Sequence, residues 1–422
     1  MLARFFYSLL LTLLAPLLLY SLYKKKQGKP SVGQRWKEHF GFTPSIPNCH
    51  QPIWIHAASV GETIAVTPLI KQLKSRHPEV KIVLTTTTST GAEQAERLGD
   101  LVTHRYTPVD FSFAINKFIR IIKPAQLLIV ETELWPNTLN AVSKANIPIT
   151  LLNARLSAKS YRGYKKVMPL FTPMAKQLST VLCQYDDDAT RFAKLGVARE
   201  KLIVAGSIKF DISITETVVE QGNRLREQLG NDRPIWIAAS THDGEDQQLL
   251  SVHRQLLSSI SEALLILVPR HPERFAHVTK LAQELGFSTV SRSSGNAINR
   301  DTQVYVGDTM GEMLTLMQAS DVCFMGGSLI GKKVGGHNLL EPAALGIPTL
   351  TGPSYYNFTD ITHALVAANA CKITHDEADI VTQLTVWLTD KQQRTACGQQ
   401  ALSVVNKNTG AIKRSLAQIA LD

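Results

Sequence analysis

Beyond residue 50, short and almost wholly apolar runs alternate along the chain with longer stretches in which apolar residues recur at helical spacing. The helical spacing is clearest in TPLIKQLKSRH at 67–77 and in TLNAVSKAN at 138–146. Continuous apolar strands separated by helices are typical of a parallel sheet that is covered on both faces. The first series of expected strands comprises PIWIHAAS (52–59), VKIVLTTTT (80–88), QLLIVET (126–132) and IPITLLNA (147–154).

The same alternation begins again at residue 233, after a less regular stretch at 208–233 that contains a polar helix. This second series opens with PIWIAASTHDGE, which repeats the pattern of PIWIHAASVGET in the first half. We therefore predict an α/β chain with two Rossmann-like domains, 24–207 and 208–422, facing each other across a cleft, with the functional site at the carboxyl ends of both sheets. The second series comprises RPIWIAAS (233–240), ALLILVPRH (263–271), STVSR (288–292), VYVG (304–307), VCFMGG (322–327) and GIPTLTG (346–352).

The N-terminal residues form a separate apolar segment. The chain carries no charge from Phe5 to Tyr23, and three lysines follow at 24–26. About 20 apolar residues are needed to cross a bilayer core, so this run is just long enough. No small-residue cleavage site follows it, so residues 1–23 are predicted to be a retained membrane anchor and not a cleaved signal. The lysines place the body on the cytoplasmic side, and Pro16 leaves open whether the anchor crosses the bilayer or lies in one leaflet.

The net charge of +10 indicates an anionic partner: a membrane surface, a phosphorylated ligand or nucleic acid. Basic and aromatic residues are not interleaved and no nucleic-acid-binding motif occurs, so nucleic acid is not an expected partner. The five cysteines are scattered without a CxxC spacing. That distribution is typical of a reducing compartment and gives no metal site.

Three charged residues of the first half are candidates for catalysis. Glu62 follows an expected strand and a small-residue turn, at the start of a helix, where it either performs chemistry or only stabilises the helix dipole. Glu131 and Glu133 end an apolar run, so one of them can face the cleft while the other caps or pairs elsewhere. The alternative is that they only cap the helix that starts near Pro136. Lys209 follows the strand KLIVA and can hold a phosphate or a sugar carboxylate, or it can be an ordinary exposed lysine.

The second half contains three glycine-rich turns, each after an expected strand, at 307–313, 326–328 and 335–342. Free backbone N–H groups in such turns bind phosphate. Arg270 and His271 add titratable groups at the end of another strand, and Glu341 can accept hydrogen bonds from ribose hydroxyls. Together these features predict a nucleotide-sugar pocket.

A metal site is not expected. Asp186–Asp188 contains the D-x-D spacing of metal-dependent transferases, but it precedes ATRFAKLG and is explained more simply by acids at a helix start. The histidines His104, His253, His277 and His363 have no neighbour at metal-ligand spacing. No cofactor is predicted.

The ordered motifs together resemble the Kdo transferases of lipopolysaccharide assembly, which carry 3-deoxy-D-manno-octulosonic acid from CMP-Kdo to a lipid A precursor. The resemblance extends from the anchor nearly to the C-terminus. It departs from some relatives in the loop GSLIGKKVGGHN, which carries Lys332 and Lys333 and affects the rim of the donor pocket. The motifs are ASVGE (58–62), ETELWPN (131–137), NARLS (153–157), GSIKFD (206–211), STHDGE (240–245), VPRHPERF (268–275), GDTMGE (307–312), GGSL (326–329) and GGHNLLEPAA (335–344).

This resemblance implies a glycosyltransferase-B fold and an inverting, metal-independent transfer to lipid IVA at the cell inner membrane. It implies that Glu62 is the general base and that Glu131 and Lys209 stabilise the transition state. The CMP contacts that it implies are Pro269, Arg270, Met310, Gly311, Glu312, Asn338, Leu339, Leu340 and Glu341.

The chemistry of these residues agrees with such a reaction. Sugar transfer passes through an oxocarbenium-like state, a carboxylate can take the acceptor proton, and cationic groups can stabilise the leaving phosphate in place of a metal. Two alternatives stay open. One is a lipid-directed enzyme of the same fold that uses a UDP-sugar, and the other is a membrane-tethered nucleic-acid binder.

Overall fold

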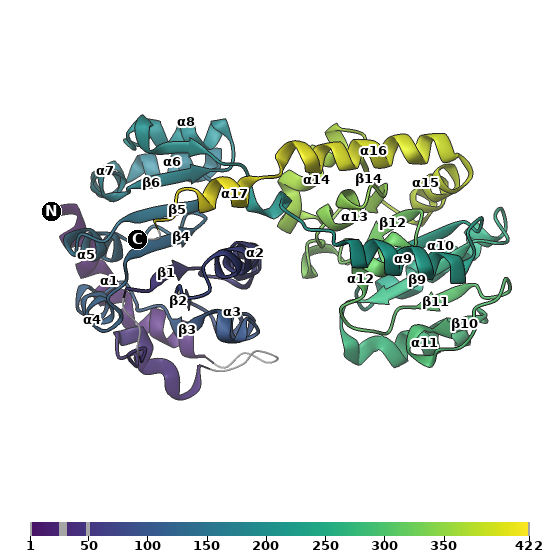
Figure 1. Ribbon diagram of the computed structural model, residues 1–422, viewed down its shortest axis with the longest axis horizontal. Coiled ribbons are helices and arrows are strands. Elements are labelled where there is room, and N and C mark those ends of the chain that lie inside the picture. Colours follow the sequence, from purple (N-terminus) through teal and green to yellow (C-terminus); the bar gives the residue numbers. More distant parts are fainter. Residues whose placement is uncertain (1, 25–31, 48–50, 421–422) are drawn as a thin grey trace. The chain divides into compact units, whose positions relative to one another are not determined.

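The computed structural model describes residues 2–24, 32–47 and 51–420, and the chain folds as two compact units (Figure 1). The first unit is formed by two segments of the chain, one that ends at Asp211 and one that begins at Thr409. The second unit is the segment between them, Ile212–Asn408. The sequence-based boundary at 207/208 falls slightly early, and the C-terminal segment was expected in the second domain. It joins the first unit because Asp211 accepts hydrogen bonds from the backbone N–H groups of Gly410 and Ile412.

Helix α17 (Ala411–Leu416) completes that return by burying apolar side chains in the core of the first unit. The same core cluster includes Ile53 and Ile55 of the central strand, whereas Trp54 between them belongs to a second cluster. Alternate residues of a strand point to opposite faces of the sheet. The first sheet is therefore covered on both faces, as the continuous apolar runs predicted.

The first unit is built on a seven-stranded parallel sheet in the order β3-β2-β1-β4-β5-β6-β7. Its strands are β1 (Ile53–His56), β2 (Ile82–Thr86), β3 (Thr103–Tyr106), β4 (Gln126–Val130), β5 (Ile149–Ala154), β6 (Thr180–Cys183) and β7 (Leu202–Val204). Its other helices are α1 (Leu2–Tyr23), α2 (Val60–Arg76), α3 (Ser89–Glu96), α4 (Ser112–Ile122), α5 (Pro136–Lys144), α6 (Ala158–Lys166), α7 (Met168–Gln177) and α8 (Asp186–Lys194), with short 3₁₀ turns such as η1 (Gly33–Phe40) and η4 (Ile208–Phe210).

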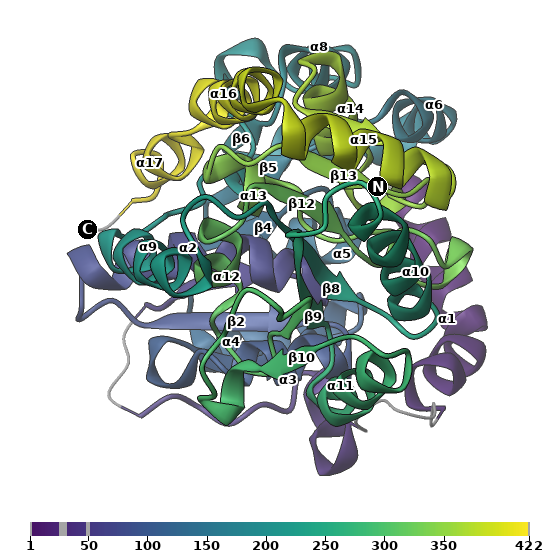
Figure 2. The ribbon, with the colours of Figure 1, turned by 90° about the vertical axis from the view of Figure 1, so that its right-hand side faces the viewer.

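The second unit has its own seven-stranded parallel sheet, in the order β10-β11-β9-β8-β12-β13-β14. On one face, α10 packs against α11 and α15 (Figure 2). The strands are β8 (Ile235–Thr241), β9 (Leu264–Pro269), β10 (Thr289–Ser291), β11 (Val304–Val306), β12 (Val322–Met325), β13 (Thr349–Thr351) and β14 (Cys371–Ile373). The helices are α9 (Glu216–Leu229), α10 (Glu245–Leu257), α11 (Phe275–Glu284), α12 (Met313–Gln318), α13 (Leu340–Ala344), α14 (Thr359–Ala367), α15 (Glu377–Thr389) and α16 (Lys391–Asn408).

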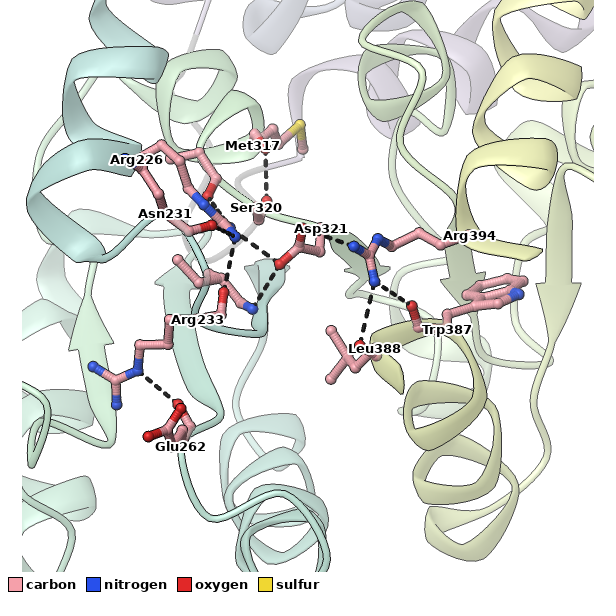
Figure 3. A network of polar contacts seen from close by, with 12 residues as sticks. Arg226, Asn231, Arg233, Glu262, Met317, Ser320, Asp321, Trp387, Leu388 and Arg394 are labelled. Atoms are coloured by element: carbon pink, nitrogen blue, oxygen red, sulfur yellow. Dashed lines mark hydrogen bonds and ion pairs between the residues drawn. The ribbon is translucent and has the colours of Figure 1, made fainter. Parts of the chain in front are cut away.

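An ion-pair network centred on Asp321 joins distant parts of the second unit (Figure 3). The Asp321 carboxylate accepts a hydrogen bond from Arg226 Nη1 at 3.0 Å and another from the backbone N–H of Ile235 at 2.9 Å. Arg394 Nη2 lies 3.7 Å from its other oxygen and belongs to α16. The network thus ties α9 and α16 to the start of the central strand β8.

In both sheets the chain order reverses beside the central strand, between β1 and β4 and between β8 and β12. In open α/β sheets, ligands bind outside the carboxyl ends of the strands at such a reversal. The segments that leave these strand ends carry Glu62 and Glu131 in the first unit, and His242 and Gly327 in the second. The fold therefore places the candidate residues where each sheet can bind a ligand.

Candidate functional site

Glu62 is held in a defined position at the start of α2. Ser59 is the N-cap of this helix, and its hydroxyl donates to Glu62 Oε1 at 2.8 Å. The backbone N–H of Ala58 donates to Glu62 Oε2 at 2.7 Å. This reciprocal arrangement resembles a capping box, so Glu62 does stabilise the helix start. That structural contribution does not prevent it from acting on a ligand, because each oxygen retains a further lone pair.

The Glu62 side chain is buried, and burial raises its pKa to about 7. Its two hydrogen bonds oppose this shift, while the charges of Glu131 and Glu133 add to it. A carboxylate with a pKa near neutrality is a stronger base than an exposed one and is still partly ionised at pH 7. Perturbed carboxyl groups of this kind are concentrated at functional sites.

Glu131 leaves strand β4 in a left-handed backbone conformation, with φ of 60°. A non-glycine residue pays a conformational strain there, and such strain is commonly found at functional sites. Lys209 Nζ lies 3.0 Å from Glu131 Oε1. Lys209 is positioned by η4, where the backbone N–H of Ile208 donates to Asn153 Oδ1 at 3.1 Å. Lys209 is therefore ion-paired with Glu131 near the strand ends, unlike a surface lysine that extends into solvent without a partner.

Of the two alternatives for the second acid, pairing elsewhere is the one observed, because Glu133 hydrogen-bonds Trp135 and does not cap α5. The helix start is held by Asp110, whose oxygens accept from the backbone N–H groups of Asn137 at 3.0 Å and Thr138 at 2.7 Å. The strand also ends at Val130, so Glu131 and Glu133 do not continue its alternation. Both acids lie close enough to raise the pKa of Glu62. The structure thus brings Glu62, Glu131, Glu133 and Lys209 together.

In the second unit, Arg270 follows β9 with its side chain exposed, and Pro269 is the last residue of the strand. The charge of Arg270 influences Glu341, whose pKa is raised by burial. Asn338 Nδ2 donates to Glu341 Oε1 at 3.3 Å, and Asn338 Oδ1 accepts from the backbone N–H of Leu340. An exposed cation and an amide–carboxyl pair thus lie on segments that follow β9 and β12, the two strands on either side of β8.

Two predicted contact residues, Leu339 and Leu340, have buried side chains. Any contact that they make with a ligand is therefore through the backbone. Met310 and Gly311 are exposed after β11, and Gly311 has φ of 83°. The neighbouring Glu312 is already paired, because Arg292 donates to both of its oxygens at 2.8 and 2.6 Å and lowers its pKa.

The predicted phosphate nest at 326–328 is filled by the protein itself. The Glu245 carboxylate accepts hydrogen bonds from the backbone N–H groups of Gly327 at 2.7 Å, Ser328 at 2.9 Å and Leu329 at 2.9 Å. Glu245 is fully buried and also accepts from the N–H of His242. The prediction that this turn binds a phosphate is wrong, because an internal carboxylate occupies its N–H groups.

A histidine cluster at the same edge was missed by the sequence analysis. His242 Nε2 lies 2.8 Å from His337 Nε2, and the rings are stacked; His271 meets His242 edge-on. Burial, with nearby cations, lowers the pKa of His242 to about 4 and that of His337 to about 3. Both are therefore neutral at pH 7. The sequence offered a signal for His242, which directly follows β8, and for His271, which is next to Arg270, but none for His337, which lies well beyond the end of β12.

The acids at 186–188 have the expected place at a helix start, although the N-cap of α8 is Tyr185. Asp188 accepts from the backbone N–H of Leu156 at 2.8 Å, and Asp187 pairs with Arg191 at 2.6 Å. Among the described residues, no group of three His, Cys, Asp or Glu side chains is arranged to hold a metal ion.

The chain is similar to several known proteins. A family model described as 3-deoxy-D-manno-octulosonic-acid transferase matches residues 34–212. The 3-deoxy-D-manno-octulosonic acid transferase of Haemophilus influenzae is 40% identical over 417 residues, which cover 98% of this chain and 97% of that protein. The Bordetella pertussis protein of the same name is 33% identical and covers 86% of each chain.

The fold is also similar to that of solved structures with little sequence identity. The structure of MurG from Acinetobacter baumannii is 11% identical, covers 88% of this chain and 99% of its own, and has a TM-score of 0.54. A similarity at this level of identity concerns the fold and not the reaction.

Proposed function

This chain belongs to the 3-deoxy-D-manno-octulosonic acid (Kdo) transferase family, and we propose that it transfers Kdo from CMP-Kdo to the lipid A precursor lipid IVA. As a family member it is a glycosyltransferase of lipopolysaccharide biosynthesis. The observation that supports the proposed chemistry best is the buried Glu62 carboxylate, whose pKa is raised to about 7 beside the Glu131–Lys209 pair.

In the proposed reaction, Glu62 takes the proton from the acceptor hydroxyl as the hydroxyl attacks the anomeric carbon of Kdo. The bond to the CMP phosphate breaks on the opposite side of the sugar, so the transfer inverts the anomeric configuration. Lys209 is paired with Glu131 and stabilises negative charge in the transition state, while Glu131 holds the lysine in place. No covalent sugar–enzyme intermediate is required.

The proposed donor site is in the second unit. Arg270 is exposed, so its guanidinium can bind the phosphate of CMP directly. Glu341 accepts from the ribose hydroxyls, next to Asn338 and the backbone of Leu339 and Leu340. Met310, Gly311 and Glu312 form a further edge of this site. The cationic contacts replace a metal ion in stabilising the leaving phosphate.

The proposed location is the inner leaflet of the cell inner membrane, with the body in the cytoplasm. One helix, with its candidate span at Leu2–Tyr20, is long and apolar enough to cross a bilayer. However, Ser8 in this helix hydrogen-bonds Asn137 of α5, and Leu11 is buried against the first unit. Residues packed on the protein cannot also be surrounded by lipid. We therefore favour a monotopic helix whose exposed face, including Leu13 and Leu17, enters one leaflet.

The test is to incubate the purified chain in detergent with lipid IVA and CMP-Kdo and to measure the lipid product by mass spectrometry. The expected product is heavier by whole Kdo residues, and its formation persists after dialysis against EDTA. Transfer from a UDP-sugar in place of CMP-Kdo would support the alternative donor. Loss of activity in EDTA that Mg²⁺ restores would contradict metal independence.

A further inference from the structure

An apolar cavity of about 190 Å³ lies in the first unit between α1 and the central strands of the sheet. Leu11, Leu19 and Leu22 of α1 form one wall. The opposite wall includes Leu127 and Ile129 of β4. An apolar cavity of about 150 Å³ is large enough to hold a benzene ring and stays free of water. The cavity beneath α1 can therefore hold a segment of an alkyl chain.

Polar side chains also line this cavity, among them His39, His56, Asp110 and Glu133. Glu133 lines it, and Glu133 is also one of the two acids whose charge raises the pKa of Glu62. Trp135, which is 38% exposed, lines the cavity a short distance along the chain. The ligand that fits this space is therefore apolar in its interior and polar where it approaches Glu133.

The helix that closes the cavity also carries the exposed apolar face proposed to enter the membrane. Leu18 lines the cavity and is 47% exposed, whereas its neighbour Leu17 is 68% exposed and does not line it. Leu18 thus joins the exposed apolar face of α1 to the wall of the cavity. A soluble sugar acceptor has no alkyl chain that could occupy this cavity.

We propose that the cavity holds a segment of one acyl chain of the lipid acceptor, and that this contact positions the acceptor hydroxyl near Glu62. The proposal rests on the proposed function for the identity of the acceptor. Val109 lines the cavity from the loop after β3 and is half-buried, so a larger side chain there can reduce the space available to an alkyl chain.

The first experiment compares Val109→Trp with Val167→Trp, which makes the same substitution at an exposed valine of the first unit that does not line the cavity. Each is assayed with lipid IVA and with the fully deacylated sugar phosphate of the same acceptor. Val109→Trp should raise the KM for lipid IVA by about tenfold, with the KM for CMP-Kdo and the kcat/KM for the deacylated acceptor unchanged. Val167→Trp should leave all three values near wild type. Equal losses on both acceptors, or no loss with Val109→Trp, would overturn the proposal.

A second experiment does not depend on turnover. Lipid IVA with a photoreactive diazirine in one acyl chain should crosslink to peptides that contain residues 107–110 or 18–22, in competition with unlabelled lipid IVA. Crosslinks confined to other peptides, or competition by an equal amount of ordinary phospholipid, would contradict the proposal. If the wild-type chain transfers no Kdo to either acceptor, the proposed function fails, and the crosslinking pattern still decides whether the cavity binds an acyl chain.

Discussion

Lys209 Nζ lies 3.0 Å from Glu131 Oε1, which joins two residues that are 78 positions apart in the chain. Their side chains are 36% and 32% exposed. A pair that is open to solvent to this extent contributes only about 0–1 kcal/mol to stability. The left-handed backbone at Glu131 and its proximity to Glu62 are therefore better explained by function than by stability.

Replacing Lys209 should reduce turnover much more than it reduces stability. Removing one group that stabilises transition-state charge typically lowers kcat by about 10²–10³-fold. Lys209→Met should show a loss of this size, with a thermal unfolding midpoint close to that of wild type. Lys201→Met provides a control on a lysine of the same unit that bonds only to backbone carbonyls. A Lys209→Met enzyme that keeps more than a third of its kcat would exclude the lysine from the transition state.

Arg270→Ala should weaken the binding of CMP. A hydrogen bond to a charged group contributes about 1.5–3 kcal/mol, which corresponds to roughly a tenfold to hundredfold weaker Kd. Arg270 is exposed, so the fold should not suffer. Isothermal titration with CMP measures the effect, and Arg300→Ala serves as the control, because Arg300 lies in the same unit with a 91% exposed side chain. Equal CMP affinity in the two variants would remove Arg270 from the donor site.

Replacing Glu245 at the start of α10 should destabilise the fold, whereas replacing Glu62 at the start of α2 should mainly reduce turnover. Glu245 is fully buried and satisfies four backbone N–H groups, so Glu245→Ala leaves buried donors without partners. Each such donor costs about 1–3 kcal/mol. We expect the second unit to unfold at a much lower urea concentration, with a loss of at least about 3 kcal/mol. A variant with the unfolding midpoint of wild type would show that the loop after β12 does not depend on Glu245.

Most central strands could be predicted from the sequence because they are apolar on both faces. The structure adds β3 and β14 at the edges of the two sheets, and β6 (TVLC) inside the first sheet. The segments THRY, TVLC and CKI are too polar or too short to stand out in the sequence. The return of α17 to the first unit could not be predicted either, because it depends on contacts of Asp211 with residues about two hundred positions later.

The candidate site, too, could be predicted only in part from the sequence. The strand-end positions of Glu62, Glu131, Lys209 and Arg270 follow from local pattern and motif. In contrast, the helix cap by Asp110 and the filling of the 326–328 turn by Glu245 depend on residues 27 and 82 positions distant. The pairing of His242 with His337 spans 95 positions. Local sequence shows that a turn can bind an anion, but not that the protein supplies its own carboxylate.

The raised pKa of Glu62 also predicts how stability varies with pH. The ordinary value of 4.5 rises to about 7 in the folded chain, so between these values the folded state binds the proton more tightly than the unfolded state. The contribution of this group is fully present below about pH 4.5 and is lost as the pH rises through 7. Glu62→Gln removes this dependence and should be more stable than wild type at pH 8, by up to about 3 kcal/mol, but not at pH 4.5. Thermal unfolding at both pH values measures the difference, and an equal difference at the two would contradict the shift.

The most direct test of the account is the turnover of Glu62→Gln with CMP-Kdo and lipid IVA. Glutamine keeps the shape of the side chain but cannot take the acceptor proton, and general-base catalysis typically contributes about 10²–10⁴-fold. CMP affinity, measured on the same folded preparation, should change little because the proposed nucleotide contacts belong to the second unit. The account predicts a fall in kcat of at least a hundredfold, about the lower end of that range, with CMP binding intact. A Glu62→Gln enzyme that binds CMP and retains most of its kcat would contradict the assignment of Glu62 as the base.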